Sequence, residues 1–186
     1  MFAGFLLAVR AFEVRAAGGE AAYPDFIEQV YLTEEAALKS VFPGCDEIRR
    51  RVWKIDPKSK SRIESRTGWT LAESSVTVFE GFAAGEPQGK AMIAEEIGKF
   101  KPITFIVKQG NDGRVERVEV MVYREAVGAE VRRQRFSRQF RGKKAGDPLR
   151  INRDILNVTG ATMSVQAMTA GVKKALVIME EAGHGK

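Results

Sequence analysis

The sequence of 186 residues has little of the chemistry on which many enzymes depend, since it contains one cysteine, Cys45, and one histidine, His184. A lone cysteine excludes an internal disulfide, and the sequence has no Cys-x-x-Cys redox pair or haem-attachment motif. A lone histidine in a glycine-rich tail excludes a histidine-centred zinc site and a Ser-His-Asp triad. Apolar runs stay well below the roughly 20 residues of a membrane-spanning helix. We therefore predict a globular protein without a metal site, in which redox chemistry would need another cofactor.

The formal charge of +6 is modest, but the basic residues are unevenly distributed. One segment gathers Arg132, Arg133, Arg135, Arg138, Arg141, Lys143 and Lys144. Such a segment is typical of a polyanion-binding module, in which Phe136 and Phe140 would be stacking platforms for bases. Phenylalanines four residues apart share one helix face, however, so we expect both in the core, and we expect no nucleic-acid partner.

Hydrophobic periodicity predicts an α+β fold. Residues 24–42, 46–55 and 58–66 have helical patterns, so a helical lead-in is expected over 24–74. From Ser75 the period changes to two, and antiparallel strands are expected in series at 75–81, 89–96, 103–109 and 114–123. Further helices are expected over the basic segment and from Thr162 to near Glu181. We predict an antiparallel sheet of about four strands flanked by helices.

The expected organisation is a single domain over residues 24–186, with its core at 75–181. Residues 1–23 include the apolar run Phe2–Val9, which is stopped by Arg10. This run resembles a degraded signal peptide, but no Lys or Arg precedes it, and a packed or frayed N-terminal helix is an equal alternative.

The segment Asn157–Ser164 reads Asn-Val-Thr-Gly-Ala-Thr-Met-Ser and leads into an apolar stretch of helical period. A helix that starts near Thr162 presents unpaired N–H groups and the positive end of its dipole, where a phosphate binds favourably. Gly160 and Ala161 leave room for close approach. A Thr or Ser in this place is also a common N-cap, so residue types alone leave the cap and the anion site open. The residues expected to face the core are Val165, Met168, Val172, Leu176 and Met179, while Lys173, Lys174 and Glu180 are expected in solvent.

Three motifs, in order, resemble the FMN-binding domain family found in Rnf and Nqr electron-transport subunits and in NosR-like proteins. The segment Thr159–Ser164 is similar to the family's Ser/Thr-Gly-Ala-Thr-x-Ser/Thr signature. Before it, the sequence has the family's Glu-x-x-Gly loop as Glu125-Ala126-Val127-Gly128 and its Phe-x-Gly-Lys motif as Phe140-Arg141-Gly142-Lys143. The resemblance spans about residues 75–181.

The resemblance implies FMN bound through a phosphoester to Thr162, in an electron carrier rather than a stand-alone enzyme. It places Asn157, Thr159, Gly160, Ala161, Met163 and Ser164 around the phosphate, with Thr159, Ser164 and nearby N–H groups contacting its free oxygens. It places Tyr123, Arg124, Glu125 and Gly128 beside the flavin ring. We expect Arg138 or Lys143 to stabilise the reduced anionic flavin.

The resemblance also implies partners and a compartment. These are a flavin transferase for maturation, a redox partner protein or membrane electron-transport complex, and the extracytoplasmic face of a membrane or the periplasm. One position departs from the family, because Leu156 stands where an Asp is usual, with Asp154 two residues away. Covalent attachment is expected, and FMN bound without the bond is the alternative.

Overall fold

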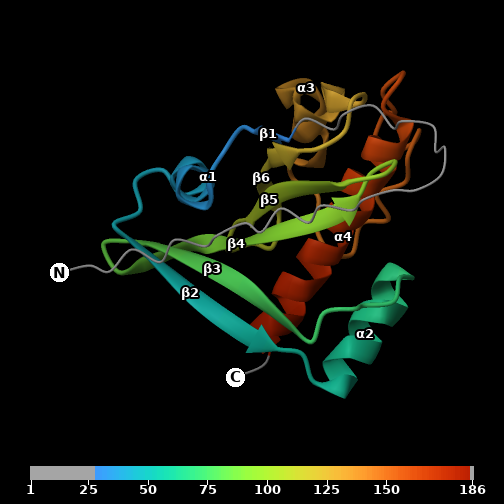
Figure 1. Cartoon of the computed structure of the whole chain (residues 1–186). Coiled ribbons are helices and arrows are strands. Elements are labelled where there is room, and N and C mark those ends of the chain that lie inside the picture. The colour runs from blue at the N-terminus through green and yellow to red at the C-terminus, as the bar shows by residue number, and fades with distance from the viewer. Residues whose placement is uncertain (1–27, 185–186) are drawn as a thin grey trace, which may run out of the picture.

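A computed structural model describes residues 28–184 (Figure 1). Its centre is one antiparallel sheet of six strands in the order β1-β6-β5-β4-β3-β2. The strands are β1 Gln29–Val30, β2 Glu47–Lys54, β3 Ser75–Ala83, β4 Glu86–Ile97, β5 Pro102–Gln109 and β6 Val115–Tyr123. Apart from the first, consecutive strands are neighbours in the sheet, so the chain builds most of it as a meander.

Helices cover both faces of this sheet. The longest, α4 (Thr162–His184), lies across one face together with α2 (Pro57–Thr67), and α1 (Glu34–Val41) packs on the other face. Between β6 and α4 the chain forms three short helical turns: η1 (Ala129–Arg132), α3 (Gln134–Ser137) and η2 (Arg138–Phe140). This arrangement gives two cores, a large one under α4 and a small one under α1.

Local sequence explains where the first two helices begin. The Thr33 hydroxyl accepts the Ala36 N–H at 3.2 Å and starts α1. The Asp56 carboxylate accepts the N–H groups of Lys58 and Ser59 at 2.9 and 3.0 Å, and Pro57 follows it at the first helical position. Both arrangements satisfy N–H groups that the helix itself leaves unpaired.

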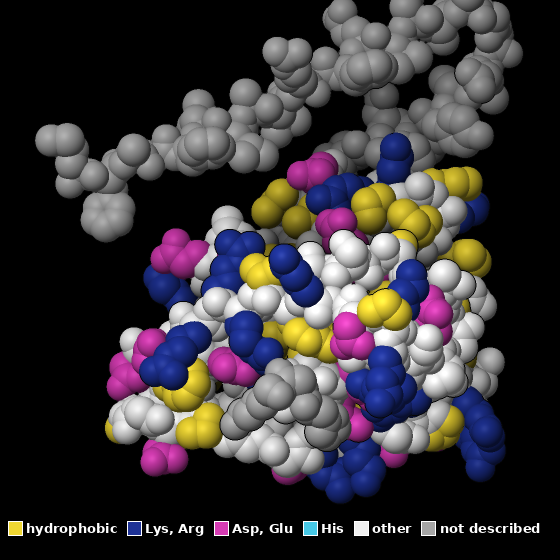
Figure 2. Space-filling view, turned by 90° about the horizontal axis from the view of Figure 1, so that it is seen from below, with side chains coloured by type: hydrophobic (Ala, Val, Ile, Leu, Met, Phe, Trp, Pro, Cys, Tyr) yellow, Lys and Arg dark blue, Asp and Glu magenta, His cyan; other side chains and the backbone are white. Residues whose placement is uncertain are grey.

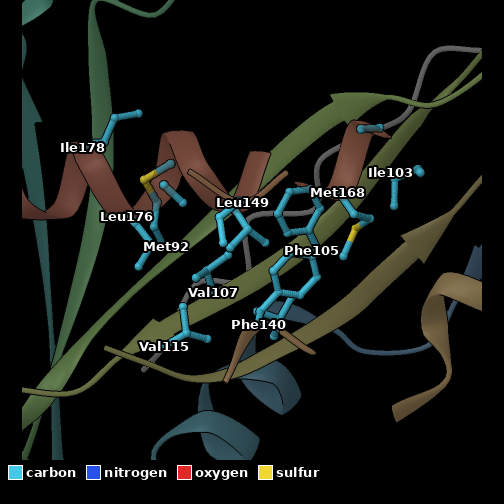
Figure 3. Close-up of a cluster of buried hydrophobic side chains, with 14 of the residues drawn as sticks. Met92, Ile103, Phe105, Val107, Val115, Phe140, Leu149, Met168, Leu176 and Ile178 are labelled. Carbon is cyan, nitrogen blue, oxygen red and sulfur yellow. The ribbon is translucent and has the colours of Figure 1, made fainter. Parts of the chain in front are cut away.

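The core under α4 is formed by the apolar stripe expected from the sequence. The residues of this stripe, all buried against β4, β5 and the η1–η2 segment, are Val165, Met168, Val172, Leu176 and Met179. Figure 3 shows Met168 and Leu176 among the side chains of the sheet. Near the middle of α4, a Cβ on Gly171 would lie 2.4 Å from the Phe105 ring and 2.6 Å from Glu96 Cγ. Glycine here therefore allows α4 to lie closer to the sheet than any side chain at this position would permit.

The predicted α+β class and the antiparallel sheet flanked by helices are confirmed, with six strands in place of about four. The helix expected at 46–55 was wrong, because these residues form β2. Ile48 and Val52 are four residues apart, a spacing that fits one face of a helix and one face of a strand equally well. The other additional strand is the two-residue β1. The segment 24–74 therefore contributes two strands as well as the two helices.

Two further expectations change. The helix expected over 132–144 is interrupted and ends at Phe140, with Gly142 in the left-handed region at φ 79°. Lys173 and Lys174 are partly buried rather than free in solvent: Lys173 donates to the carbonyls of Ala145 and Asp147, and Lys174 pairs with Glu96. The prediction for residues 1–23 falls outside the described residues.

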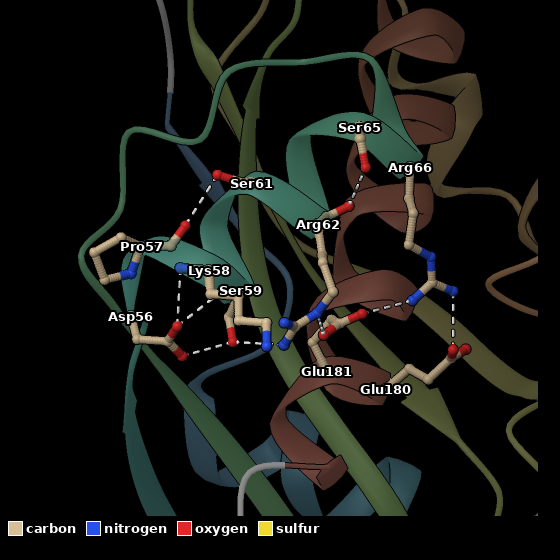
Figure 4. Close-up of polar contacts among 10 residues, drawn as sticks. All are labelled: Asp56, Pro57, Lys58, Ser59, Ser61, Arg62, Ser65, Arg66, Glu180 and Glu181. Carbon is tan, nitrogen blue, oxygen red and sulfur yellow. Dashed lines mark hydrogen bonds and ion pairs between the residues drawn. The ribbon is translucent and has the colours of Figure 1, made fainter.

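The C-terminal half of α4 is joined to α2 by ion pairs (Figure 4). Glu181 is buried, and its two carboxylate oxygens accept from Arg62 Nε at 2.7 Å and from Arg66 at 3.0 Å. The other terminal nitrogen of Arg66 donates to Glu180 at 2.9 Å. We call these four residues the α2–α4 latch.

Positive and negative side chains are intermixed on the surface seen in Figure 2.

Candidate functional site

A tight turn with open space beside it leads into α4. The Ala161 N–H donates to the Val158 carbonyl at 2.9 Å, and the Val165 N–H makes the first helical bond to the Ala161 carbonyl, also at 2.9 Å. Gly160 has φ +81°, a conformation that favours glycine, and no atom lies within 4 Å of the place that a Cβ would occupy. Thr162 is the first residue of the helix and its side chain is exposed.

This helix start has unused hydrogen-bond donors. Within residues 28–184 the backbone N–H groups of Thr162, Met163 and Ser164 have no acceptor. Such groups, together with the helix dipole, favour an anion in front of the helix. The Asn157 amide donates to Thr162 Oγ1 at 3.3 Å, while its oxygen accepts the Val158 N–H at 2.9 Å. Asn157 therefore orients the Thr162 hydroxyl and leaves its proton free. Thr159 is exposed beside it.

The Glu-x-x-Gly loop packs directly against this helix start. The buried Tyr123 hydroxyl donates to the Val127 carbonyl at 2.6 Å and bonds Ser164 Oγ at 2.9 Å. Since a phenol has one proton, the Ser164 hydroxyl must donate in the second bond. Burial raises the pKa of Tyr123, although the Ser164 hydrogen bond opposes this shift. Gly128, at φ +90°, fits closely: a Cβ there would lie 2.6 Å from Ser164 Oγ and 2.7 Å from the Tyr123 hydroxyl.

The structure thus gives Ser164 a different partner from the one expected. Its side chain is 4% exposed and its proton is used on Tyr123, so it holds the loop in place instead of facing an anion in front of the helix.

Glu125 points toward the turn between β4 and β5, and Arg124 points toward the start of β5. The buried Glu125 carboxylate accepts the Phe100 and Lys101 N–H groups at 2.7 and 3.1 Å. Arg124 donates to Glu28 at 2.8 Å and to Thr104 at 2.9 Å. Both side chains therefore fix the loop to the sheet, and in these contacts neither faces Thr162.

The structure does not place the contacts of Arg138 and Lys143 at the start of α4. Arg138 donates to Gln134 at 2.9 Å and lines a cavity whose walls include none of the residues 157–164. Lys143 follows the left-handed Gly142, and its carbonyl accepts the Val115 N–H at 2.7 Å. Phe136 and Phe140 are buried edge to face with ring centroids 5.4 Å apart. Both rings lie in the core, as expected from the sequence, so bases cannot stack on them.

One contact near the site was not predicted from the sequence. Gln139, between Arg138 and Phe140, accepts the Leu156 N–H at 2.7 Å and donates to the Leu156 carbonyl at 3.4 Å. It fixes the segment that leads to Thr162. A glutamine between a basic residue and a core phenylalanine carries no sequence signal for such a role.

Apolar side chains around the helix start are exposed. Val127 is 62% exposed, Leu156 66% and Met163 47%, and they come from three segments that the contacts above join. Exposed apolar groups beside unpaired anion-binding N–H groups suit a ligand with a flat apolar ring and a phosphate. The residues present therefore fit FMN.

Comparison with known proteins agrees with this geometry. Residues 98–177 match the FMN-binding domain family, from the residue after β4 through most of α4. The match spans 80 of the 186 residues, and the cofactor that it indicates is FMN. No curated protein sequence matches the chain.

Two solved structures resemble the fold. NqrC from Shewanella oneidensis has a TM-score of 0.56 at 12% identity, covering 75% of this chain and 86% of its own. A second structure, a component of the Na(+)-translocating NADH-quinone reductase from Parabacteroides distasonis, has a TM-score of 0.46 at 15% identity, covering 72% and 74%. Among residues 28–184, none of the helices combines the length and apolar character needed to cross a bilayer.

Proposed function

We propose that this protein is an electron-transfer flavoprotein that carries FMN esterified through its phosphate to Thr162. The observation that carries the proposal is the exposed Thr162 hydroxyl, placed as the first residue of α4 directly after a left-handed glycine turn. When bound, FMN supplies one- and two-electron transfer, and the protein contributes position, burial and field.

The residues at the helix start would divide the work of holding the phosphate. The unpaired N–H groups of Thr162, Met163 and Ser164 donate to its free oxygens. Asn157 orients the Thr162 oxygen, the exposed Thr159 hydroxyl is a further donor, and Gly160 keeps the approach open. Ala161, expected to leave room as well, is 2% exposed and packs into the core beneath the turn. Ser164 acts indirectly, since its bond to Tyr123 holds the Glu-x-x-Gly loop beside the site.

The flavin ring would lie against the exposed apolar side chains. Val127, Leu156 and Met163 provide that surface, and the loop from Tyr123 to Gly128 forms its flank. Glu125 holds this loop through its contact with the β4–β5 turn, and Arg124 holds it through Thr104 of β5. Arg138 and Lys143 act at longer range through their charge, which favours the anionic reduced cofactor.

Attachment would form a bond between Thr162 Oγ1 and phosphorus, with loss of the hydroxyl proton. Direct esterification would have to release water, so the donor must be an activated FMN phosphoanhydride, from which a nucleotide leaves when its P–O bond breaks. A flavin transferase is the partner that such a step needs.

Non-covalent FMN is the second candidate, and Leu156 favours it. Leu156 stands at the usual Asp position, while the Asp154 carboxylate accepts the Arg150 N–H at 2.8 Å within its own turn. Asp154 is therefore already engaged locally.

We further propose that residues 24–186 act as one unit on the extracytoplasmic face of a membrane and exchange electrons with a membrane-associated redox chain. Support for the single unit comes from β1 and β2, which join the same sheet as β3–β6. Support for the redox chain comes from the family resemblance and from NqrC, whose fold this chain shares.

The test is intact mass after co-expression with a flavin transferase. We expect the chain to gain the mass of one FMN less one water, and expect Thr162→Ala to gain nothing. Native mass spectrometry of the same samples detects FMN bound without a bond. Unmodified wild-type protein that still binds FMN would support the non-covalent candidate, and protein that binds no FMN in either form would contradict both.

A further inference from the structure

Part of β6 is an open edge of the sheet. β1 pairs only with Tyr123 and Val122, and the Tyr31 and Leu32 N–H groups continue this contact only as far as the Met121 carbonyl. At the other end, residues 142 and 143 bond Val115. Among residues 28–184, the stretch Glu116–Val120 therefore has a strand partner on its β5 side alone. Open strand edges are places where a further strand can add.

This open edge lies along a groove. A cavity of about 770 Å³ is lined by all five residues from Glu116 to Val120. One wall is the end of α1 and the residues after it, with Val41 and Phe42, and the other wall is α3 and η2. Tyr31 and Leu32 close one end. The groove thus combines backbone hydrogen-bonding groups with apolar walls, which is the arrangement that captures extended peptides.

The charge of the groove is unbalanced. Its two glutamates are neutralised, because Glu116 pairs with Lys108 and Glu119 pairs with Arg117. Arg132, Arg138 and Arg141 line the same groove, and no carboxylate among residues 28–184 forms an ion pair with them. The Arg132 guanidinium lies 4.3 Å from the Tyr31 ring centroid, and Arg138 bonds the neutral Gln134. Three uncompensated arginines therefore face an occupant of this groove.

We propose that this groove binds an extended acidic segment of a partner protein, which adds to β6 as a further strand along Glu116–Val120. Backbone hydrogen bonds to the open edge hold the segment, and its carboxylates pair with Arg132, Arg138 and Arg141. The site is separate from the flavin site and does not depend on bound flavin. One contact links the two sites, because Gln139 in η2 hydrogen-bonds the backbone of Leu156.

Charge argues against two other occupants. Residues 1–27 of this chain carry three acidic and two basic side chains, so they do not supply the missing negative charge. A second copy paired through the same edge would bring its own three arginines against these.

The test uses the full chain, prepared with and without flavin, and three labelled synthetic peptides. The first alternates Glu and Val, the second replaces each Glu with Lys, and the third is the acidic peptide with alternate prolines, which cannot donate backbone hydrogen bonds. We expect only the first peptide to bind well, in both preparations, and to slow amide hydrogen exchange at residues 116–120.

The variant to compare is Arg132→Glu/Arg141→Glu. It should weaken binding of the acidic peptide by about tenfold or more, since 1.4 kcal/mol is a factor of ten. The matched control Lys54→Glu/Lys58→Glu changes the net charge equally on β2 and α2, outside the groove, and should leave binding nearly unchanged.

Several results would overturn the proposal. Equal weakening in both double variants would show attraction by net charge only, and equal binding of the proline peptide would exclude strand addition. Protection of residues 116–120 without any peptide would mean that the groove is already filled by this chain. A dimer that the groove variant dissociates would assign the edge to a second copy, and no binding of the acidic peptide would remove the site.

Discussion

The two ends of α4 are built in opposite ways. At the N-terminal end, donors are left unpaired, Thr162 is exposed, and the surrounding apolar side chains of Val127, Leu156 and Met163 face outward. At the C-terminal end, the buried Glu181 carboxylate is satisfied by two arginines of α2. One end therefore keeps interactions available to a ligand, and the other uses them internally to hold the helix. The comparison predicts that substitutions at the two ends separate cofactor loading from stability.

The largest effect is expected for Thr162→Ala, which should abolish covalent flavin completely, because the methyl group cannot form the ester. The fold should survive, since Thr162 lies inside the first turn, its hydroxyl accepts only the Asn157 amide, and alanine is a good helix former. Thr162→Ser should retain some flavin, because it keeps the hydroxyl and loses only the methyl that restricts χ1. In-gel flavin fluorescence after denaturation measures the bond, and circular dichroism checks the fold.

Thr159→Ala and Ser164→Ala are the controls, and both should keep the bond. Fluorescent denatured Thr162→Ala protein would show that attachment lies elsewhere, with these two hydroxyls as the next candidates.

At the opposite end, Glu181→Gln should lower the free energy of unfolding by about 1.5–3 kcal/mol, the range for hydrogen bonds that involve charged groups. Flavin loading should be unchanged. Urea denaturation measures the loss. Glu180→Gln is the matched control, since the Glu180 side chain is 39% exposed and its ion pair should contribute less than about 1 kcal/mol. Equal losses for the two variants would contradict the importance of burial in the latch.

The latch should also make stability depend on acid. Burial alone would raise the pKa of Glu181, but the hydrogen bonds and charges of Arg62 and Arg66 outweigh it and leave the pKa below its usual value. This contribution is therefore present above the unfolded pKa of about 4.3 and disappears as the pH falls through the folded pKa. Wild-type protein should lose stability in this acid range more steeply than Glu181→Gln. Urea titrations at a series of pH values measure both slopes, and parallel curves would remove Glu181 from this role.

At the open end, Tyr123→Phe should cost about 1 kcal/mol, because it breaks the hydrogen bonds to Val127 and Ser164. Burial raises the folded pKa of Tyr123. The stability that depends on the neutral phenol is therefore present below about pH 10 and disappears as the pH rises through the folded pKa. The alkaline loss should be smaller in the Phe variant. Thermal unfolding at neutral and alkaline pH tests this, and covalent flavin should remain in both proteins.

The smallest effect is expected for Arg138→Ala and Lys143→Ala, which should each keep the flavin and lower its reduction potential slightly. Removal of a positive charge disfavours the anionic reduced form, and the effect is small because Arg138 faces the β6 groove. Spectroscopic redox titration measures the potential. An unchanged potential in both variants would limit Arg138 to the groove and remove Lys143 from the flavin site.

Sequence reasoning was accurate where one local cause decides the outcome. The start of α4 at Thr162 follows from Gly160 and the apolar stripe after it, both visible in the sequence. The strand β2 was missed because Ile48 and Val52 fit two periods, and only pairing with β3 decides between them.

Contacts between distant segments could not be predicted. The partner of Ser164 is Tyr123, 41 residues earlier in the chain, and the partners of Glu181 lie in α2, at separations of 119 and 115 residues. A buried carboxylate and an exposed one look alike in a sequence, as Glu181 and Glu180 do.

Gly171 has a consequence for the reach of mutations across the molecule. Because its missing side chain lets α4 touch Phe105 and Glu96, this contact limits how far the middle of the helix stands from the sheet. A rigid helix transmits that height along its length, so even a methyl group at its middle would raise Thr162 away from Asn157 and from the loop at Gly128. The geometry around Thr162 thus depends on a residue that does not contact it.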